Sequence, residues 1–367
     1  MEWWVGQPGD PASLLERFCE QEGFSVDDLS DSGPVRHSET GMCGVALIVS
    51  SAAGSVMAGG NPGRPSPARS VPDMVAIAYA HDDERRCPVM EPAPLRLEGW
   101  VSSWRSCEHA AAVDRVRQAI AAGDVYQVNV VGHHHSRYAG EPASAVAAVS
   151  ALPGGGYAGV MSGDDWAVAS ASPECFIEVV SGWVETRPIK GTRPATEAGA
   201  EELLKSVKER AEHVMIVDLE RNDLARIAVP GSVSVTDFFA LRRWCDLWQA
   251  ESTVSARVAE GVGLAELLRA VCPPGSVTGA PKLAALDVIA AQEPVGRGPA
   301  MGAMGYLSVG RLVLGLTIRT VAVEVDRIHL WAGGGVTWRS DPDDEVDEAL
   351  AKAAPVKAAV NAQTLGC

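Results

Sequence analysis

The sequence predicts an α+β protein built on antiparallel sheets, and three observations support this fold class. Segments with strand character and segments with helix character occur in blocks, whereas a doubly wound parallel sheet requires strict alternation. Two pairs of strand-like segments lie close enough in sequence to form β-hairpins, which are antiparallel. The chain of 367 residues, 47% hydrophobic and 21% charged, is long enough and apolar enough for a large globular core.

The first half of the sequence is patterned less clearly than the second. Between Gly54 and Pro72, Gly, Pro and Ser are frequent, which predicts short strands with long loops or a degenerate subdomain over residues 1–95. The pattern sharpens from about Cys107. Strands are then expected at 125–131 and 166–170, and hairpins at 175–180 with 183–186 and at 312–325 with 327–331. The first hairpin turns at Ser181-Gly182.

Apolar residues at helical spacing predict the helices. The longest, residues 200–227, has an apolar face made of Leu203, Val207, Ala211, Val214 and Met215. The last, residues 343–354, is expected to end or kink at Pro355. The others are expected at 108–122, 143–151, 264–271 and 281–292.

Charge and composition exclude several classes of function. A net charge of −16 argues against a nucleic-acid surface or an anionic membrane surface, because both need clustered Lys and Arg. A small anionic substrate is still compatible with this net charge, since one nearby cation outweighs acidic groups that lie beyond a screening length of about 8 Å. The chain shows no secretory signal, no apolar run long enough to span a membrane, and eight scattered cysteines without a C-x-x-C pair. These features predict a cytoplasmic protein with reduced thiols and no zinc site.

Lys190 and Glu174 are candidates for nucleophile and general acid. Lys190 follows a strand-like segment within Arg187–Pro194, where an amine is either a nucleophile or a solvated loop residue. Glu174 lies sixteen residues earlier, across the predicted hairpin, so the two side chains are expected to face one pocket. If burial raises its pKa, Glu174 acts as a general acid; otherwise it is a strand-edge partner in a surface ion pair.

Two predicted helices each carry two glutamates three residues apart. This spacing places Glu209 with Glu212, and Glu345 with Glu348, on one face of each helix. Two such faces brought together offer the hard oxygen ligands that Mg²⁺ takes, although each face alone is compatible with a solvated acidic surface. Lys352, one turn after Glu348, is either its ion-pair partner or a cation for a bound anion.

Four later segments are suited to holding a small dianion, although each alone is compatible with ordinary turn or strand structure. The run Pro273–Lys282 opens a helix, where backbone amides favour a carboxylate. Arg319 lies in a strand-like segment and can bind a carboxylate through two hydrogen bonds. The other two segments are Gly302–Tyr306 and Gly333–Gly335.

In this order the motifs resemble the chorismate-utilising enzyme family, which contains anthranilate synthase component I, aminodeoxychorismate synthase component I, isochorismate synthase and salicylate synthase. The resemblance covers roughly residues 108–360. Besides the segments above, it rests on Ala122–Asn129, Ser172-Pro173-Glu174, Lys208-Glu209, Asp218–Asp223 and Asp341–Glu348.

The resemblance implies two antiparallel sheets flanked by helices, with the active site in a central cleft. Residues 101–367 are then the chorismate-binding catalytic domain, and residues 1–100 a short degenerate N-terminal region of the same fold. It also implies chorismate as substrate and Mg²⁺ bound by Glu212 and Glu348, with Glu209 and Glu345 close by. The implied substrate-binding residues are Gln127, Ser276, Thr278, Gly279, Tyr306, Arg319, Gly333, Gly334, Gly335 and Lys352.

Two positions sort the branches of this family. Isochorismate and salicylate synthases resemble one another in having a lysine base where this chain has Gln127, so Gln127 favours the amine-installing enzymes. Anthranilate synthases typically have alanine where this chain has Lys190. The resemblance therefore favours the aminodeoxychorismate synthases, in which this lysine is thought to attack C2 while Glu174 assists departure of the C4 hydroxyl. The implied ammonia source is a separate glutamine amidotransferase subunit.

The chain departs from the family pattern at two places. Gln249, in Trp248–Thr253, stands at about the position where the family usually has a histidine. In anthranilate synthases this histidine is associated with the loss of pyruvate. The segment Leu14-Leu15-Glu16-Arg17 only partly matches the Leu-Leu-Glu-Ser-like segment of tryptophan-regulated relatives, so feedback by tryptophan is not expected. The alternatives are an anthranilate or 2-amino-2-deoxyisochorismate synthase, an isochorismate synthase, or a non-catalytic homologue.

Overall fold

Two antiparallel sheets form the framework of the molecule. The computed structural model describes residues 1–30, 41–80, 95–244 and 247–363. The ten-stranded sheet has the order β1 (Glu2–Trp3), β3 (Met74–Tyr79), β2 (Gly44–Val49), β15 (Ala303–Ser308), β16 (Arg311–Leu316), β9 (Cys175–Val180), β10 (Trp183–Arg187), β13 (Leu247–Arg257) and β11 (Ile189–Pro194), with β12 (Ser234–Trp244) also paired to β13. The eight-stranded sheet has the order β14 (Gly279–Ala280), β6 (Gln127–Gly140), β18 (Arg327–Val336), β17 (Thr320–Val323), β8 (Ala167–Ser172) and β7 (Tyr157–Ser162), with β4 (Leu95–Leu97) and β5 (Val101–Ser102) paired to β6.

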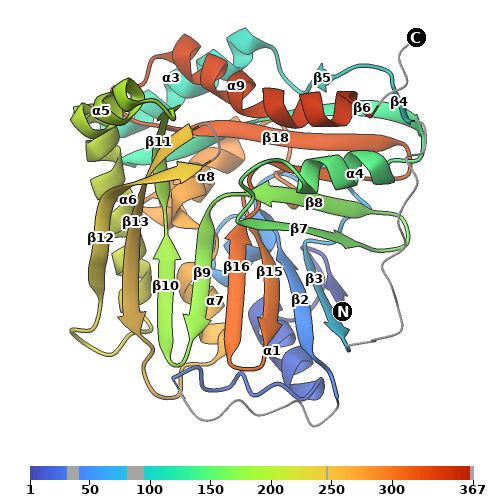
Figure 1. Cartoon of the computed structure of the whole chain (residues 1–367), viewed down its shortest axis with the longest axis vertical. Helices are drawn as coiled ribbons and strands as arrows, with labels where there is room; N and C mark the ends of the chain where they lie inside the picture. Colours follow the sequence, from blue (N-terminus) through green and yellow to red (C-terminus); the bar gives the residue numbers. More distant parts are fainter. Residues whose placement is uncertain (31–40, 81–94, 245–246, 364–367) are drawn as a thin grey trace.

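Helices flank both sheets. In Figure 1 the strands of the ten-stranded sheet run up and down in the lower half, while those of the eight-stranded sheet run across the upper half. Helices α3 (Ser106–Ala122), α4 (Ala143–Ser150) and α9 (Pro342–Asn361) pack on the second sheet. The remaining helices are α1 (Pro11–Gln21), α2 (Ser51–Met57), α5 (Glu197–Lys205), α6 (Val207–Ala225), α7 (Leu264–Val271) and α8 (Lys282–Gln292), with the short 3₁₀ helix η1 at Gly275–Val277. No helix in the described ranges combines the length and the apolar composition that crossing a membrane requires.

The predicted fold class is confirmed, and several elements lie where the sequence places them. Helix α7 has the expected bounds, and α3 ends at Gly123, whose φ of 86° fits a glycine at a helix C-terminus. Strands β9 and β10 form the predicted hairpin, with φ values of 50° at Ser181 and 77° at Gly182, as a two-residue turn of this kind requires. The first 95 residues hold more regular structure than expected, because they include α1, α2 and strands that pair beside β15.

The helix expected over residues 200–227 is wrong in two respects. It is divided at Ser206, which ends α5 and also begins α6, where its hydroxyl accepts a hydrogen bond from the Glu209 amide at 3.2 Å. Most of the expected apolar face is not buried either: Leu203 is fully buried, but Val207 is 74% exposed and Val214 is 51% exposed. The side chains that α6 buries are instead His213, Ile216, Val217, Glu220, Asp223 and Leu224. Polar groups share the buried stripe, which misleads a prediction based on apolar periodicity.

Two further expectations are corrected. The strand expected over 312–325 is two strands, because the backbone leaves the ten-stranded sheet after Leu316 and enters the other sheet at Thr320. Helix α9 does not end at Pro355 but continues to Asn361. Ala353, Val356 and Val360 of α9 are fully buried in an apolar cluster with β17 and β18, and this burial offsets the roughly 3 kcal/mol that an internal proline costs.

Candidate functional site

Glu174 and Arg319 lie where the chain crosses between the two sheets. Pro173-Glu174 joins β8 to β9, and Thr317–Arg319 joins β16 to β17. The two crossings run side by side, because the Leu316 amide donates to the Glu174 carbonyl at 3.1 Å and the Ala171 amide donates to the Arg319 carbonyl at 3.2 Å. Arg319 has a φ of 50°, a left-handed backbone that non-glycine residues seldom adopt. Such backbone geometry is often found at functional sites.

Glu174 is a buried carboxyl beside a lysine. Its Oε1 accepts a hydrogen bond from Ser276 Oγ at 2.9 Å. Burial raises the pKa of Glu174 to about 7, against the opposing effects of the Lys190 charge and the Ser276 hydrogen bond. A carboxyl with this pKa is poised to donate or accept a proton near neutral pH.

Lys190 reaches the same serine from the other side. It lies on β11, half-buried, and its Nζ donates to the Ser276 carbonyl at 3.1 Å. The register of β11 against β13 shifts between Lys190 and Thr192, where Gly191 has a φ of 71°. A Cβ on Gly191 would lie 2.6 Å from Leu203 Cδ1 and 3.1 Å from Glu209 Oε2, so only glycine lets this strand pack so closely on α5 and α6. The structure therefore brings Lys190, Glu174 and Ser276 together, as the hairpin argument expected for the first two.

Two of the four glutamates, Glu345 and Glu348 of α9, lie against the Gly333–Gly335 strand, whereas Glu209 of α6 lies against Gly191. A Cβ on Gly334 would be 2.9 Å from Glu345 Oε2 and 3.3 Å from Glu348 Oε1. Burial raises the pKa of Glu212 to about 7, and the charges of Glu209 and Glu345 add to this shift, so the two helices lie within electrostatic reach of each other. Burial also raises the pKa of Glu345. At Glu348 burial again favours the neutral form, but the charges of Lys352, Lys190 and Lys208 and the hydrogen bond from Lys352 together lower the pKa.

These carboxylates offer the oxygen ligands that Mg²⁺ takes. Within the described ranges no group of three or more His, Cys, Asp or Glu side chains is gathered as a metal centre. Mg²⁺ usually keeps several waters and takes only one or two carboxylates together with groups of its substrate. Like-charged carboxyls whose pKa values are raised by burial and by each other, as at Glu212, are also those that a divalent cation stabilises. The donor set is therefore compatible with Mg²⁺ at Glu212 and Glu348.

The Gly333–Gly335 segment of β18 also faces Gln127 and Lys352. Lys352 Nζ donates to the Gly333 carbonyl at 3.0 Å and pairs with Glu348 at 2.5 Å. A Cβ on Gly335 would lie 2.3 Å from Gln127 Nε2, so a larger residue at this position would displace the Gln127 side chain. Among the described residues, Gln127 Oε1 and Asn129 Oδ1 are buried without a hydrogen-bond partner. Buried acceptors of this kind are rare and suit the donor groups of a ligand.

Three other expected site residues lie differently. The Thr278 hydroxyl donates to the Pro274 carbonyl at 2.8 Å, and Gly279 pairs with Val128, so both shape the turn that carries Ser276. Tyr306 lies apart from the group. Its strand meets the site at Ala303, which pairs with Leu316, and three residues along a strand separate the two positions by about 10 Å. The described surroundings of Tyr306 include Tyr79 and Arg311, on a more exposed part of the sheet.

The buried polar residues of α6 have no individual role in the sequence-based prediction, although Glu220 and Asp223 lie in one of its motifs. His213 Nε2 lies 2.6 Å from Ser252 Oγ, and burial lowers the pKa of this imidazole to about 4. Asp223 pairs with Lys282 at 2.7 Å. Glu220 lies beside the turn that carries Ser276. The signal available was the spacing of these polar residues along one helical stripe, since Glu220 and Asp223 are three apart. Gln249 is buried on β13 opposite Thr192.

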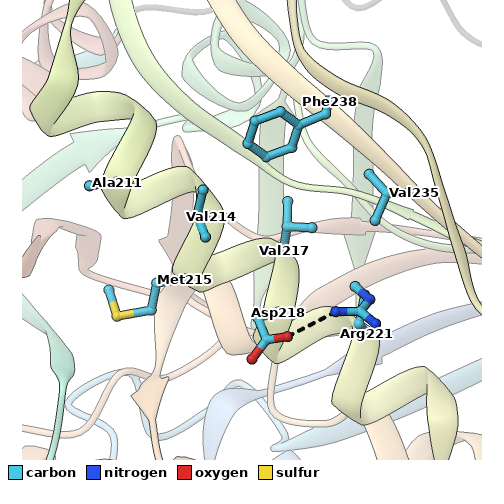
Figure 2. Close-up of a pocket in the computed structure, with 8 residues that line it drawn as sticks. All are labelled: Ala211, Val214, Met215, Val217, Asp218, Arg221, Val235 and Phe238. Carbon is cyan, nitrogen blue, oxygen red and sulfur yellow. Dashed lines mark hydrogen bonds and ion pairs between the residues drawn. The ribbon is translucent and has the colours of Figure 1, made fainter.

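An open groove on the other face of α6 does not belong to this group. It lies between α6 and β12 (Figure 2) and has a volume of about 370 Å³. An exposed ion pair between Asp218 and Arg221, at 3.0 Å, lies on its wall. Its lining residues are Ala211, Val214, Met215, Val217, Asp218, Arg221, Val235 and Phe238. Lys190, Glu174 and Ser276 are not among them.

Comparison with known proteins places these residues in a family context. Residues 63–358 match the family model described as chorismate binding enzyme. The chain is 36% identical over 290 residues to aminodeoxychorismate synthase component 1 of Salmonella typhimurium, covering 75% of this chain and 64% of that protein. It is 35% identical over 291 residues to anthranilate synthase component 1 of Arthrobacter globiformis, covering 76% of this chain and 55% of that protein. The chain thus spans between about half and two thirds of the length of these curated relatives.

The same architecture occurs in solved structures. Anthranilate synthase component I from Streptococcus pneumoniae superposes with a TM-score of 0.80 at 24% identity, covering 97% of this chain and 89% of that one. The menaquinone-specific isochorismate synthase from Escherichia coli superposes with a TM-score of 0.68 at 20% identity, covering 74% of this chain and 64% of that one. These likenesses establish the fold.

Proposed function

The chain belongs to the chorismate-binding enzyme family, and on that premise we propose that it is an aminodeoxychorismate synthase component I. In this proposal it converts chorismate and ammonia to 4-amino-4-deoxychorismate and water. One observation carries the proposal: Lys190 and Glu174 are held by the carbonyl and the hydroxyl of the same residue, Ser276. This places a nucleophilic amine and a carboxyl of raised pKa beside one another, which a covalent displacement requires.

Lys190 is the proposed nucleophile and Glu174 the proposed acid. The deprotonated Nζ forms a bond to C2 of chorismate, the two conjugated ring double bonds shift, and the C4–O bond breaks. Glu174 gives its proton to the departing hydroxyl, which leaves as water. Ammonia then bonds to C4, the double bonds shift back, and the C2–Nζ bond breaks to restore the lysine. The ammonium group formed at C4 passes one proton to the Glu174 carboxylate, which restores the acid and balances the charges.

The remaining residues are proposed to bind the substrate. Arg319, at the second crossing between the sheets, is suited to one substrate carboxylate. Gln127 has a buried acceptor ready for a substrate donor. Glu212 and Glu348, with Glu209 and Glu345 beside them, are proposed to hold Mg²⁺, which when bound supplies positive charge to the substrate carboxylates. Tyr306 is left out of this set because of its position along β15.

A separate glutamine amidotransferase subunit is the proposed source of ammonia. The relatives of this chain are named as component 1, which supports a two-component arrangement. The product retains the enolpyruvyl group and suits the biosynthesis of p-aminobenzoate for folate or specialised metabolism.

An anthranilate synthase is the second candidate. The chain is almost equally similar to relatives of this name, which supports it. Lys190 speaks against it, because a lysine at this position resembles the aminodeoxychorismate synthases, whereas anthranilate synthases typically have alanine. Gln127 speaks against an isochorismate synthase, because isochorismate synthases resemble one another in having a lysine base at this position.

Mass spectrometry of the products tests the proposal directly. Purified protein is incubated with chorismate, Mg²⁺ and ammonium at near-neutral pH. A product that retains the enolpyruvyl group and that an aminodeoxychorismate lyase converts to p-aminobenzoate supports the proposal. Anthranilate instead replaces it with the second candidate. Unchanged chorismate, both alone and with a glutaminase subunit added, favours a non-catalytic homologue.

A further inference from the structure

Three polar groups of Ser276 face three different acidic or basic side chains. Its hydroxyl donates to Glu174 and its carbonyl accepts from Lys190. Its backbone amide faces the carboxyl of Glu220, a residue for which the proposed mechanism has no use. The orientation of this one residue therefore determines how both reacting groups are held.

Glu220 lies directly against the turn that carries Ser276. It is 2% exposed, and a Cβ on Gly275 would be 3.1 Å from its Oε1. The charged and titratable groups around it are Asp223 on the same helix, Lys282 at the start of α8, and Glu174 at the first crossing. Burial raises the pKa of Glu220, the Asp223 charge adds to the shift, and Lys282 opposes it.

The far end of the turn is anchored without Glu220. Arg297 Nη1 donates to the Val277 carbonyl at 2.7 Å, and the Thr278 amide donates to the Gly275 carbonyl at 3.1 Å. Lys282 ties Asp223 of α6 to the Val271 carbonyl at the end of α7, at 2.7 and 2.8 Å. Lys282 thus ties α6 to the end of α7, which precedes the turn, and Glu220 is an α6 side chain that faces the Ser276 amide.

We propose that Glu220 is a positioning residue, which holds the Gly275–Val277 turn so that Ser276 keeps Glu174 and Lys190 in their reactive orientation. This inference rests on the proposed function for its chemistry, but it requires only that the chain turn over chorismate, whichever product results. Glu220 touches neither reacting group through a hydrogen bond of its own, so its contribution is the placement of Ser276.

Steady-state kinetics of four variants tests the inference. Glu220→Ala removes the carboxyl that lies against the Gly275–Val277 turn, and kcat should fall by about 10- to 100-fold, as displacement of reacting groups by about 1 Å does, while the KM for chorismate changes little. Glu220→Asp withdraws the carboxyl by one methylene and should lose a comparable part of kcat. Glu220→Gln keeps an acceptor at the same reach and should restore most of kcat. Asp218→Ala, two residues away on the exposed face of α6, is the matched control and should behave as wild type.

Two readouts separate positioning from simple loss of stability. The pH profile of kcat should change in Glu220→Ala and Glu220→Asp but not in Glu220→Gln. Only the first two variants lose the side chain that holds the Gly275–Val277 turn in place. Hydrogen exchange at the Ser276 amide, measured without substrate, should be faster in Glu220→Asp than in Glu220→Gln or wild type. If Glu220→Ala does not fold, the aspartate and glutamine variants still decide the question.

Several results would overturn the inference. These are wild-type kcat and pH profile in Glu220→Asp, a glutamine variant as slow as the aspartate variant, or unchanged exchange at Ser276. The proposed function fails in a different way. If wild-type protein makes anthranilate, kcat for that product still tests Glu220, and if it makes no product, the exchange measurement does.

Discussion

Lys190 Nζ donates a hydrogen bond to the Ser276 carbonyl oxygen over 3.1 Å, although 86 positions of sequence separate the two residues. The contact joins β11, at the edge of the ten-stranded sheet, to the turn that leads into β14 of the other sheet. The lysine is therefore half-buried and directed, unlike the freely rotating side chain of a surface lysine. A directed amine loses less conformational entropy when it reacts, which is consistent with a nucleophilic role.

Replacing Lys190 should remove the covalent route. Lys190→Ala should lower formation of the 4-amino product by at least about 100-fold, because no other amine is expected to reach C2 in its place. Lys190→Arg keeps the positive charge but not the nucleophile, and it should be equally inactive. Product formation is measured by mass spectrometry with chorismate, Mg²⁺ and ammonium. A fully active alanine variant would remove the covalent mechanism from consideration.

Glu174 should cause the turnover rate of the enzyme to fall on the alkaline side of its pH profile, which is called the alkaline limb below. Because burial raises the pKa of Glu174 to about 7, this side chain keeps its proton below that pH and loses it as the pH rises further. Turnover that depends on its proton should therefore fall above pH 7. Glu174→Gln should lower kcat by about 10²- to 10⁴-fold and abolish that limb. A glutamine variant with the wild-type pH profile would assign the limb to another group.

The same shift also makes stability depend on pH. The ordinary pKa of a glutamate is 4.5, so between 4.5 and about 7 the folded protein binds more protons here than the unfolded chain does. The contribution of Glu174 to stability is thus fully present below pH 4.5 and is lost as the pH rises through 7. Chemical denaturation of Glu174→Gln should show a flatter decline in the free energy of unfolding across this interval than wild type.

Magnesium binding should depend on one glutamate from each helix. Glu212→Gln and Glu348→Gln should each weaken Mg²⁺ binding by about 10-fold or more in calorimetric titrations with chorismate present, because each removes one ligand charge. EDTA should stop turnover and added Mg²⁺ should restore it. Glu201→Gln, on an exposed ion pair of α5, is the control and should bind as wild type. Unchanged affinity in both site variants would place the metal elsewhere.

Adjacent leucines on α5 provide a test of which face of this helix is buried. Leu203 is fully buried and Leu204 is 51% exposed. Leu203→Ala should destabilise the fold by about 2–5 kcal/mol, whereas Leu204→Ala should change stability by less than about 0.5 kcal/mol. Urea denaturation measures both differences. Equal effects would mean that the two leucines are buried to a similar extent.

The sequence predicts the secondary structure well where apolar periodicity is the main signal, as in α7, and where turn residues are specific, as at Ser181-Gly182. It fails along α6, because His213, Glu220 and Asp223 occupy the buried stripe and leave Val207 and Val214 outside. It also fails after Leu316, because one apolar run serves two sheets and nothing in its composition marks the crossing at Arg319.

The candidate site was predictable as a set of motifs but not as a set of contacts. Lys190 and Glu174 lie together as the hairpin argument expected, yet the residue that connects them, Ser276, comes from a turn a hundred positions later. Local spacing cannot reveal such a link. Tyr306 is the opposite case, because it belongs to one of the expected motifs but does not lie at the site. It is three residues along β15 from Ala303, the residue at which this strand meets the site.

The pair of crossings at Glu174 and Arg319 has a mechanical consequence. Each crossing is covalently continuous with both sheets and is hydrogen-bonded to the other crossing, so any sliding of one sheet over the other strains both crossings. A rigid ligand that engages both residues acts as a brace between the layers, and part of its binding free energy resists their separation. Loss of ligand affinity should accordingly precede loss of the apolar core during denaturation, which makes binding an early indicator of damage to the molecule.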